Sequence, residues 1–142
     1  MIYLPDVNVW VALAVSSHIH HPAAVAWVGT CEQDTLVFCR VTEMGLLRLL
    51  TNERVMGEDV LRPKAAWAVR DGFFRDERVR FHDEPAGLES QWRGLTRGQR
   101  GGTNFWTDAY LSGFSKMAGV TLVSFDKGLR PFAGESLCLL KR

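Results

Sequence analysis

The sequence predicts a single α/β domain with a central, mainly parallel sheet of about five strands. Three observations predict this fold class. Short apolar runs typical of strands alternate with longer amphipathic segments typical of helices, as in a sheet covered on both faces. The length of 142 residues suits one domain with a sizeable core. No repeat, linker or low-complexity tract divides the chain, so we expect one domain spanning residues 1–142.

The composition is that of a soluble globular protein. The hydrophobic fraction is 46% and the charged fraction 23%. A net charge of +1 excludes a global basic field, so any nucleic acid would have to be bound by a local patch. We find no stretch long enough for a membrane span and no basic leader. The 3 cysteines lack metal-like spacing, which favours free thiols. We therefore expect a cytoplasmic protein with no membrane partner.

The first half of the chain is expected to form two strands and four helices. Apolar residues nearly fill the segment after the first strand, as in a buried helix. Pro22 suits the first turn of the second helix. Pro63 lies within the first turns of the fourth helix, which indicates a later start for it. The expected strands are 2–4 and 36–39, and the expected helices are 7–15, 22–28, 41–50 and 58–70.

The second half continues the alternation. We expect strands at 79–82, 120–125 and 136–140, and helices at 87–95 and 104–117. Between the two helices lies a glycine-rich loop, 98–102, which its composition makes flexible. Thr103 or Asn104 would cap the helix that follows.

Four acidic residues are predicted to meet at one edge of this sheet. Asp6 follows the first strand and Asp126 the fourth. Glu43 and Asp108 lie in the first turns of helices. In right-handed βαβ units strands end, and the next helices begin, on the same edge. Each of Asp6, Glu43 and Asp108 has apolar neighbours, and no lysine or arginine is an evident partner for each of the four acids.

Carboxylates gathered in this way repel one another unless a cation neutralises them. Oxygen ligands alone select a hard ion, Mg²⁺ or Mn²⁺. Such an ion polarises a phosphoryl oxygen and lowers the pKa of a bound water. The chemistry indicated is metal-assisted hydrolysis of a phosphodiester.

Four segments of the sequence resemble the motifs of PIN-domain proteins, and most of all the VapC ribonuclease toxins of VapBC toxin–antitoxin pairs. The segments are Asp6-Val7-Asn8, Thr42 to Asn52, Thr107 to Leu111 and Leu122 to Leu129. The resemblance implies a PIN-domain-like three-layer sandwich and an endoribonuclease that depends on Mg²⁺ or Mn²⁺. It also implies a VapB-type antitoxin as partner and a homodimer. Transfer RNA and ribosomal RNA are both reasonable substrates, and the sequence does not choose between them.

The resemblance also implies roles for individual residues. Asp6 and Asp108 would be the main metal ligands, and Glu43 and Asp126 would complete the catalytic pocket. Independently of the resemblance, two neutral side chains, Asn8 and Ser124, could orient a carboxylate or water at the substrate site, with local turn bonding as the alternative.

Three further residues could contact RNA directly. Arg97 and Arg100 in the glycine-rich loop could hold phosphates, with a solvated loop as the alternative. Trp106 could stack on a base.

Two other functions remain open at this stage. An acidic-pocket phosphatase normally has a second carboxylate two residues after the first, whereas this chain has Asn8 there. A receiver-like module would bind Mg²⁺ and a partner without hydrolysing RNA.

Overall fold

The computed structural model describes residues 1–98 and 100–141, so Gln99 of the expected loop and Arg142 at the end of the expected domain lie outside it. The described chain contains one parallel five-stranded sheet with the strand order β3-β2-β1-β4-β5. Its strands are β1 (Ile2–Pro5), β2 (Thr35–Phe38), β3 (Val79–Phe81), β4 (Thr121–Ser124) and β5 (Leu137–Leu139). The expected α/β class with a parallel sheet of about five strands is confirmed.

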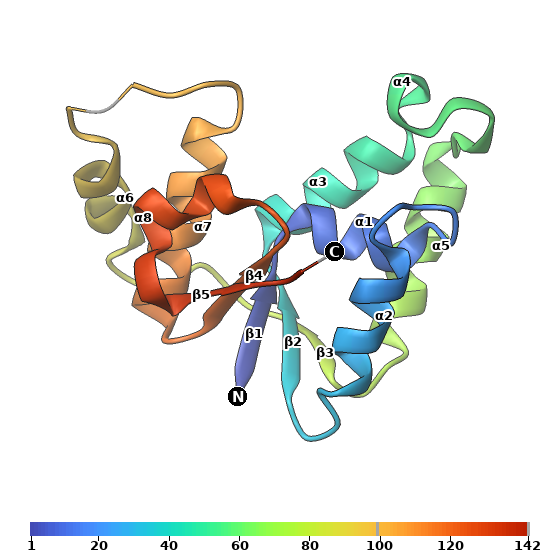
Figure 1. The fold of residues 1–142 in the computed structure, drawn as a ribbon, viewed down its shortest axis with the longest axis horizontal. Coiled ribbons are helices and arrows are strands. Elements are labelled where there is room, and N and C mark those ends of the chain that lie inside the picture. Colours follow the sequence, from blue (N-terminus) through green and yellow to red (C-terminus); the bar gives the residue numbers. More distant parts are fainter. Residues whose placement is uncertain (99, 142) are drawn as a thin grey trace.

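Two layers of helices cover the sheet (Figure 1). One layer holds α1 (Val7–Ala14), α2 (His21–Gly29), α3 (Arg40–Leu50) and α5 (Pro63–Phe74). The other layer holds α6 (Leu88–Thr96), α7 (Phe105–Ala118) and α8 (Arg130–Ala133). The result is the expected three-layer sandwich.

Alternation along the strands builds the two cores. Leu4 and Val37 belong to the core under α6 and α7, whereas their neighbours Tyr3 and Leu36 pack with the core under α1, α3 and α5. Successive side chains of a strand point to opposite faces, so a strand buried on both faces is apolar at every position.

The structure corrects the expected helix at 58–70. That stretch begins with a 3₁₀ turn, Gly57–Asp59, and the helix α5 runs from Pro63 to Phe74. Proline at the first helical position lacks only an N–H that would be unpaired there anyway. A short helix α4 (Glu53–Met56), capped by the Asn52 side chain, precedes the 3₁₀ turn and was not expected.

The strand order reverses between β1 and β4. From β1 the chain moves outward to β2 and β3, and it then crosses back to add β4 on the other side of β1. Pairing continues past the end of β1, because the Asp6 backbone N–H donates to Val123 O at 2.8 Å. In open α/β sheets, ligands bind outside the carboxyl ends of the strands at such a reversal. Across the described residues, we find no helix with the length and apolar character needed to cross a membrane.

Candidate active site

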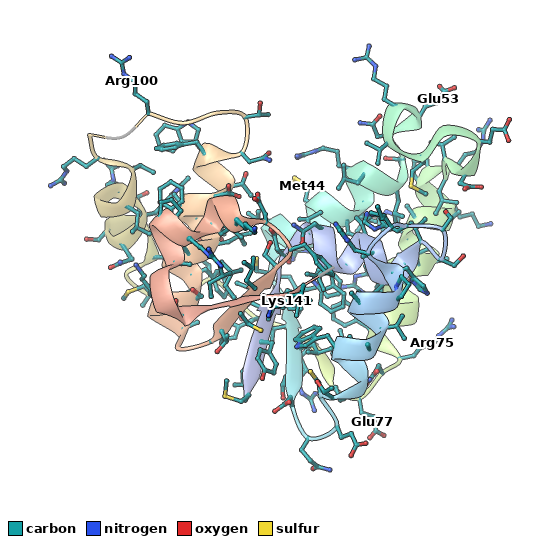
Figure 2. The ribbon with its side chains drawn as sticks, in the orientation of Figure 1. Met44, Glu53, Arg75, Glu77, Arg100 and Lys141 are labelled. Carbon is teal, nitrogen blue, oxygen red and sulfur yellow. The ribbon has the colours of Figure 1, made fainter. Side chains whose placement is uncertain are left out.

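A cavity of about 440 Å³ lies at the strand reversal, between the two helical layers. Its walls come from α1, α3, α7 and the turn after β4. The lining residues are Asp6, Val7, Asn8, Val41, Met44, Gly45, Arg48, Leu49, Asn104, Thr107, Asp108 and Asp126. Three of the four expected acids therefore share one cavity with Met44. Figure 2 shows Met44 between the two helical layers.

Asp6 is fixed by two hydrogen bonds at the start of α1. Its Oδ1 accepts from the Val7 N–H at 2.7 Å, and its Oδ2 accepts from the Ser124 hydroxyl at 2.9 Å. The residue is only 9% exposed. Burial raises the pKa of Asp6, and the charge of Asp126 raises it further, while the two hydrogen bonds oppose this shift. The carboxylate is thus held in one orientation, and no basic side chain of residues 1–98 or 100–141 forms an ion pair with it.

Asp108 lies in the first turn of α7 and faces the same cavity. Partial burial, and then the charges of Asp6 and Asp126, raise the pKa of Asp108 to about 7. The three acids are therefore close enough for their charges to repel one another, which is the property expected of a cation site.

A small hydrogen-bond network joins Asp126 to Asp6. The fully buried Ser124 hydroxyl donates to Asp6 and accepts from the Asp126 N–H at 3.0 Å and from Asn8 Nδ2 at 3.1 Å. Asn8 Oδ1 in turn accepts from the Phe125 N–H at 3.4 Å. Asp126 is exposed, and its Oδ1 accepts from the Gly128 N–H at 2.8 Å. Ser124 and Asn8 thus fix the relative positions of β1 and β4 where both carry an acid.

Glu43 does not line this cavity in the described structure. Its carboxylate accepts from Arg40 Nη1 at 2.6 Å and from Arg70 Nε at 2.9 Å, and its side chain is 3% exposed. Met44 of α3 lines the cavity. Successive residues of a helix are rotated by about 100° around its axis, so Glu43 faces another direction. The expectation that no arginine would neutralise these acids is therefore wrong for Glu43. Its catalytic role stays a prediction, and it requires the carboxylate to leave both arginines.

Arg48 is the cavity residue that sequence reasoning missed. It lies one helical turn after Met44, and its side chain forms no ion pair within residues 1–98 and 100–141. Val41, Gly45 and Arg48 share a spacing of three to four residues, which places them on one face of α3. That spacing was the available signal, but a search for carboxylates alone passes over it.

Arg100 lines a second cavity, of about 470 Å³, which adjoins the first. Asn104 and Asp108 belong to both cavities. Figure 2 shows the Arg100 side chain extending outward from the loop before α7. Arg97 and Trp106 instead face a separate groove beside α6.

The acid-lined cavity fits a hard cation held by few protein ligands. Its donors are carboxylate oxygens, and a cation would relieve their mutual repulsion. In the part of the chain that the structure describes, no three Asp, Glu, His or Cys side chains converge tightly enough to enclose a metal ion. Mg²⁺ commonly binds through one or two carboxylates and keeps several waters. Carboxylate oxygens of this kind are compatible with a hard cation such as Mg²⁺.

Comparison with known proteins identifies the family to which this fold belongs. The sequence profile of the PIN domain matches residues 3–135, so the chain belongs to the PIN-domain family. Ribonuclease VapC41 of Mycobacterium tuberculosis is 40% identical over 144 residues, covering 98% of this chain and 99% of the relative. Ribonuclease VapC38 of the same organism is 32% identical over 132 residues, with 89% and 86% covered. Within the PIN-domain family the chain therefore groups with the VapC ribonucleases.

Solved structures share the fold. VapBC2 from Rickettsia felis, bound to a promoter DNA fragment, matches 99% of this chain and 100% of that chain with a TM-score of 0.70 and 15% identity. VapC20 of Mycobacterium tuberculosis, described as a sarcin-ricin loop cleaving toxin, matches 91% and 92% with a TM-score of 0.65 and 20% identity. At these identities the likeness establishes the architecture only.

Proposed function

We propose that this protein is an endoribonuclease dependent on Mg²⁺ or Mn²⁺ and that it acts as the toxin of a type II toxin–antitoxin pair. The observation that carries the proposal is the coupling of Asp6, Asp108 and Asp126 in one cavity at the strand reversal. Membership in the VapC ribonucleases supports RNA as the substrate.

Asp6 and Asp108 are the proposed metal ligands. When bound, the cation would polarise a phosphoryl oxygen and lower the pKa of a bound water. Ser124 holds the Asp6 carboxylate in its orientation, so that little rearrangement is needed on binding. Asp126, exposed at the cavity rim, is placed to hold a water or to accept its proton.

Arg48 is the proposed phosphate ligand on the opposite wall. Its guanidinium is permanently charged and can bind two phosphate oxygens at once. The cavity would then hold a phosphodiester between a cation at the carboxylates and a cation on α3. Arg100, at the adjoining cavity, is proposed to bind a neighbouring phosphate.

The proposed partners follow from the family. A VapB-type antitoxin is expected, since the Rickettsia felis neighbour is a VapBC pair. A homodimer, the cytoplasm as location, and transfer or ribosomal RNA as substrate are proposals that the resemblance supports.

The central experiment is cleavage of labelled RNA with and without Mg²⁺, followed by sequencing of the new ends. Asp6→Asn should lower the rate by more than about 100-fold, because loss of a residue that only supports a metal ligand already costs 10–100-fold. Asp59→Asn, at an exposed acid in the 3₁₀ turn, is the matched control and should cleave normally.

Three results would contradict the proposal or replace it. Full cleavage by Asp6→Asn, or by wild type in excess chelator, would exclude the proposed metal site. Release of terminal phosphate without internal cuts would indicate a phosphatase. Mg²⁺ binding without any RNA cleavage would indicate a catalytically silent module.

A further inference from the structure

An exposed tryptophan beside the candidate site is held in a fixed orientation. Trp106 is 61% exposed although it lies in the first turn of α7. The rings of Phe105 and Trp92 meet it edge-on, at centroid distances of 5.3 and 6.1 Å. Trp92 Nε1 also donates to the Trp106 carbonyl at 3.0 Å. A rigid, exposed aromatic ring can stack on a planar ligand at little cost in conformational entropy.

Trp106 forms one wall of a groove of about 420 Å³ between α6 and α7. The other lining residues are Glu89, Trp92, Arg93, Thr96 and Arg97. Arg93 pairs with Glu89 at 3.3 Å, but both side chains are exposed and the pair is weak. Arg97 forms no ion pair with any residue that the structure describes. Aromatic walls with an arginine rim are the chemistry of single-stranded nucleic-acid binding.

The groove and the acidic cavity lie on different sides of the first turn of α7. Trp106 faces the groove, while Thr107 and Asp108 face the cavity. The two sites are separated by roughly one helix diameter, about 10 Å. A short single strand crossing the start of α7 can therefore reach both.

We propose that this groove binds an unpaired nucleobase of the RNA, stacked on Trp106, while Arg97 binds its phosphate. The inference rests on the proposed ribonuclease function and adds a substrate subsite to it. RNA is favoured over an apolar segment of a protein partner because three of the six lining residues are charged. A base read by stacking would give the enzyme a preference for single-stranded RNA near the scissile bond.

The test is binding of a fluorescein-labelled single-stranded RNA in chelator, where the proposed cleavage is absent. Trp106→Ala should raise Kd about tenfold or more, whereas Trp106→Phe should retain most of the affinity because phenylalanine also stacks. The matched control is Trp67→Ala, which removes an exposed tryptophan of α5 and should leave Kd unchanged. Quenching of tryptophan fluorescence by RNA should shrink in Trp106→Phe.

The slope of log Kd against log salt concentration reports the number of ions released on RNA binding. Arg97→Gln should lower this slope by about one, while Arg75→Gln should leave it unchanged. Figure 2 places Arg75 far from the loop that carries Arg100.

A scan of single abasic positions in the RNA locates the stacked base. One abasic position should lose the same affinity as Trp106→Ala, and the two losses should not add. Unchanged binding and KM in Trp106→Ala, with normal cleavage by wild type, would overturn the subsite but not the ribonuclease. Loss of self-association or of antitoxin binding in that variant, with RNA affinity intact, would also overturn it. Failure of wild type to cleave, with RNA binding still dependent on Trp106, would instead refute the ribonuclease.

Discussion

Ser124 illustrates how a neutral residue can organise a charged site. Its hydroxyl is fully buried and serves Asp6, Asn8 and the Asp126 N–H together. The motif around the fourth acid indicated Ser124 as a candidate for orienting a carboxylate, and the hydrogen bond to Asp6 fits that role. Because the side chain has no exposed surface, its contribution to RNA binding would be indirect.

Arg48 gives the first prediction at the residue scale. Arg48→Gln should raise KM for RNA with a smaller effect on kcat, because phosphate binding is lost while the carboxylates stay in place. The salt dependence of RNA binding should fall by about one ion. Steady-state cleavage at several salt concentrations measures both, with Arg75→Gln as control. A fall in kcat at unchanged KM would contradict simple phosphate binding.

Glu43 gives the second prediction. In the structure its carboxylate pairs with Arg40 and Arg70. The Arg70 Cζ atom also lies 3.9 Å from the centroid of the Phe74 ring. Glu43→Gln should therefore lower the free energy of unfolding by about 2 kcal/mol, less than for a fully buried pair because both arginines are partly exposed. Urea denaturation provides the measurement.

The control for Glu43 is Asp71→Asn, which removes the exposed partner of the same Arg70. Its effect should stay below about 1 kcal/mol. If Glu43→Gln instead lost activity as Asp6→Asn does, at unchanged stability, the carboxylate would have to move to the cavity during catalysis. That result would support the catalytic role that the sequence motif predicts.

At the scale of elements, the close contact of α1 with α3 sets the width of the candidate site. A Cβ atom built on Gly45 would lie 2.5 Å from Val7 Cγ2. Glycine therefore lets α3 approach α1, and this approach brings Arg48 to the cavity that Asp6 lines.

Gly45→Ala tests this close contact. The substitution should destabilise the protein by about 1–3 kcal/mol, because it overfills a packed interface. The control is Gly72→Ala in α5, where nothing lies within 4 Å and alanine should stabilise the helix by about 0.5–1 kcal/mol. Thermal unfolding compares the two, and the double variant Val7→Ala/Gly45→Ala should recover part of the loss. Equal effects of Gly45→Ala and Gly72→Ala would contradict the contact.

The elements that could be predicted from the sequence are those set by local pattern. Apolar residues such as 36–38 and 122–123 identify strands, and each acid's place after a strand or at a helix start follows from chain order. The pairing of Glu43 with Arg70 joins residues 27 positions apart and depends on how α5 lies against α3. No periodicity of the sequence encodes that distance, and the correct start of α5 at Pro63 would have been needed first.

At the scale of the whole molecule, the fold brings acids from distant segments into mutual repulsion. Asp108 is separated in sequence from Asp6 and Asp126, yet both raise its pKa. Without a bound metal, this repulsion destabilises the folded state relative to the unfolded chain, because the acids lie far apart once the chain unfolds. Stability of the whole protein should therefore depend on pH and on cation through this site.

The sign follows from the pKa of Asp108, which is about 7 in the folded state and near 3.8 in the unfolded chain. Between these values the folded protein keeps a proton that the unfolded chain releases, so stability falls as pH rises toward 7. Asp108→Asn removes the charge. Because Asp108 is partly exposed, solvent screens its repulsion, and we expect the variant to gain only ~1 kcal/mol. In chelator at about pH 8 it should therefore unfold roughly 3 °C above wild type, since a gain of this size moves the Tm of such a chain by about 2–4 °C. At about pH 5 the difference in Tm between Asp108→Asn and wild type should be smaller.

With millimolar Mg²⁺ at about pH 8, wild type should have a higher Tm than Asp108→Asn. A cation that binds only the folded state raises Tm, and it binds best where its carboxylate ligands are ionised. Wild type should therefore gain Tm with Mg²⁺ at about pH 8 and much less at about pH 5. Asp108→Asn should gain little at either pH, because one proposed ligand is lost. Differential scanning calorimetry of both proteins measures these shifts, with Asp59→Asn as the control that should follow wild type. A gain from Mg²⁺ that was equal in wild type and Asp108→Asn would place the cation outside this cavity.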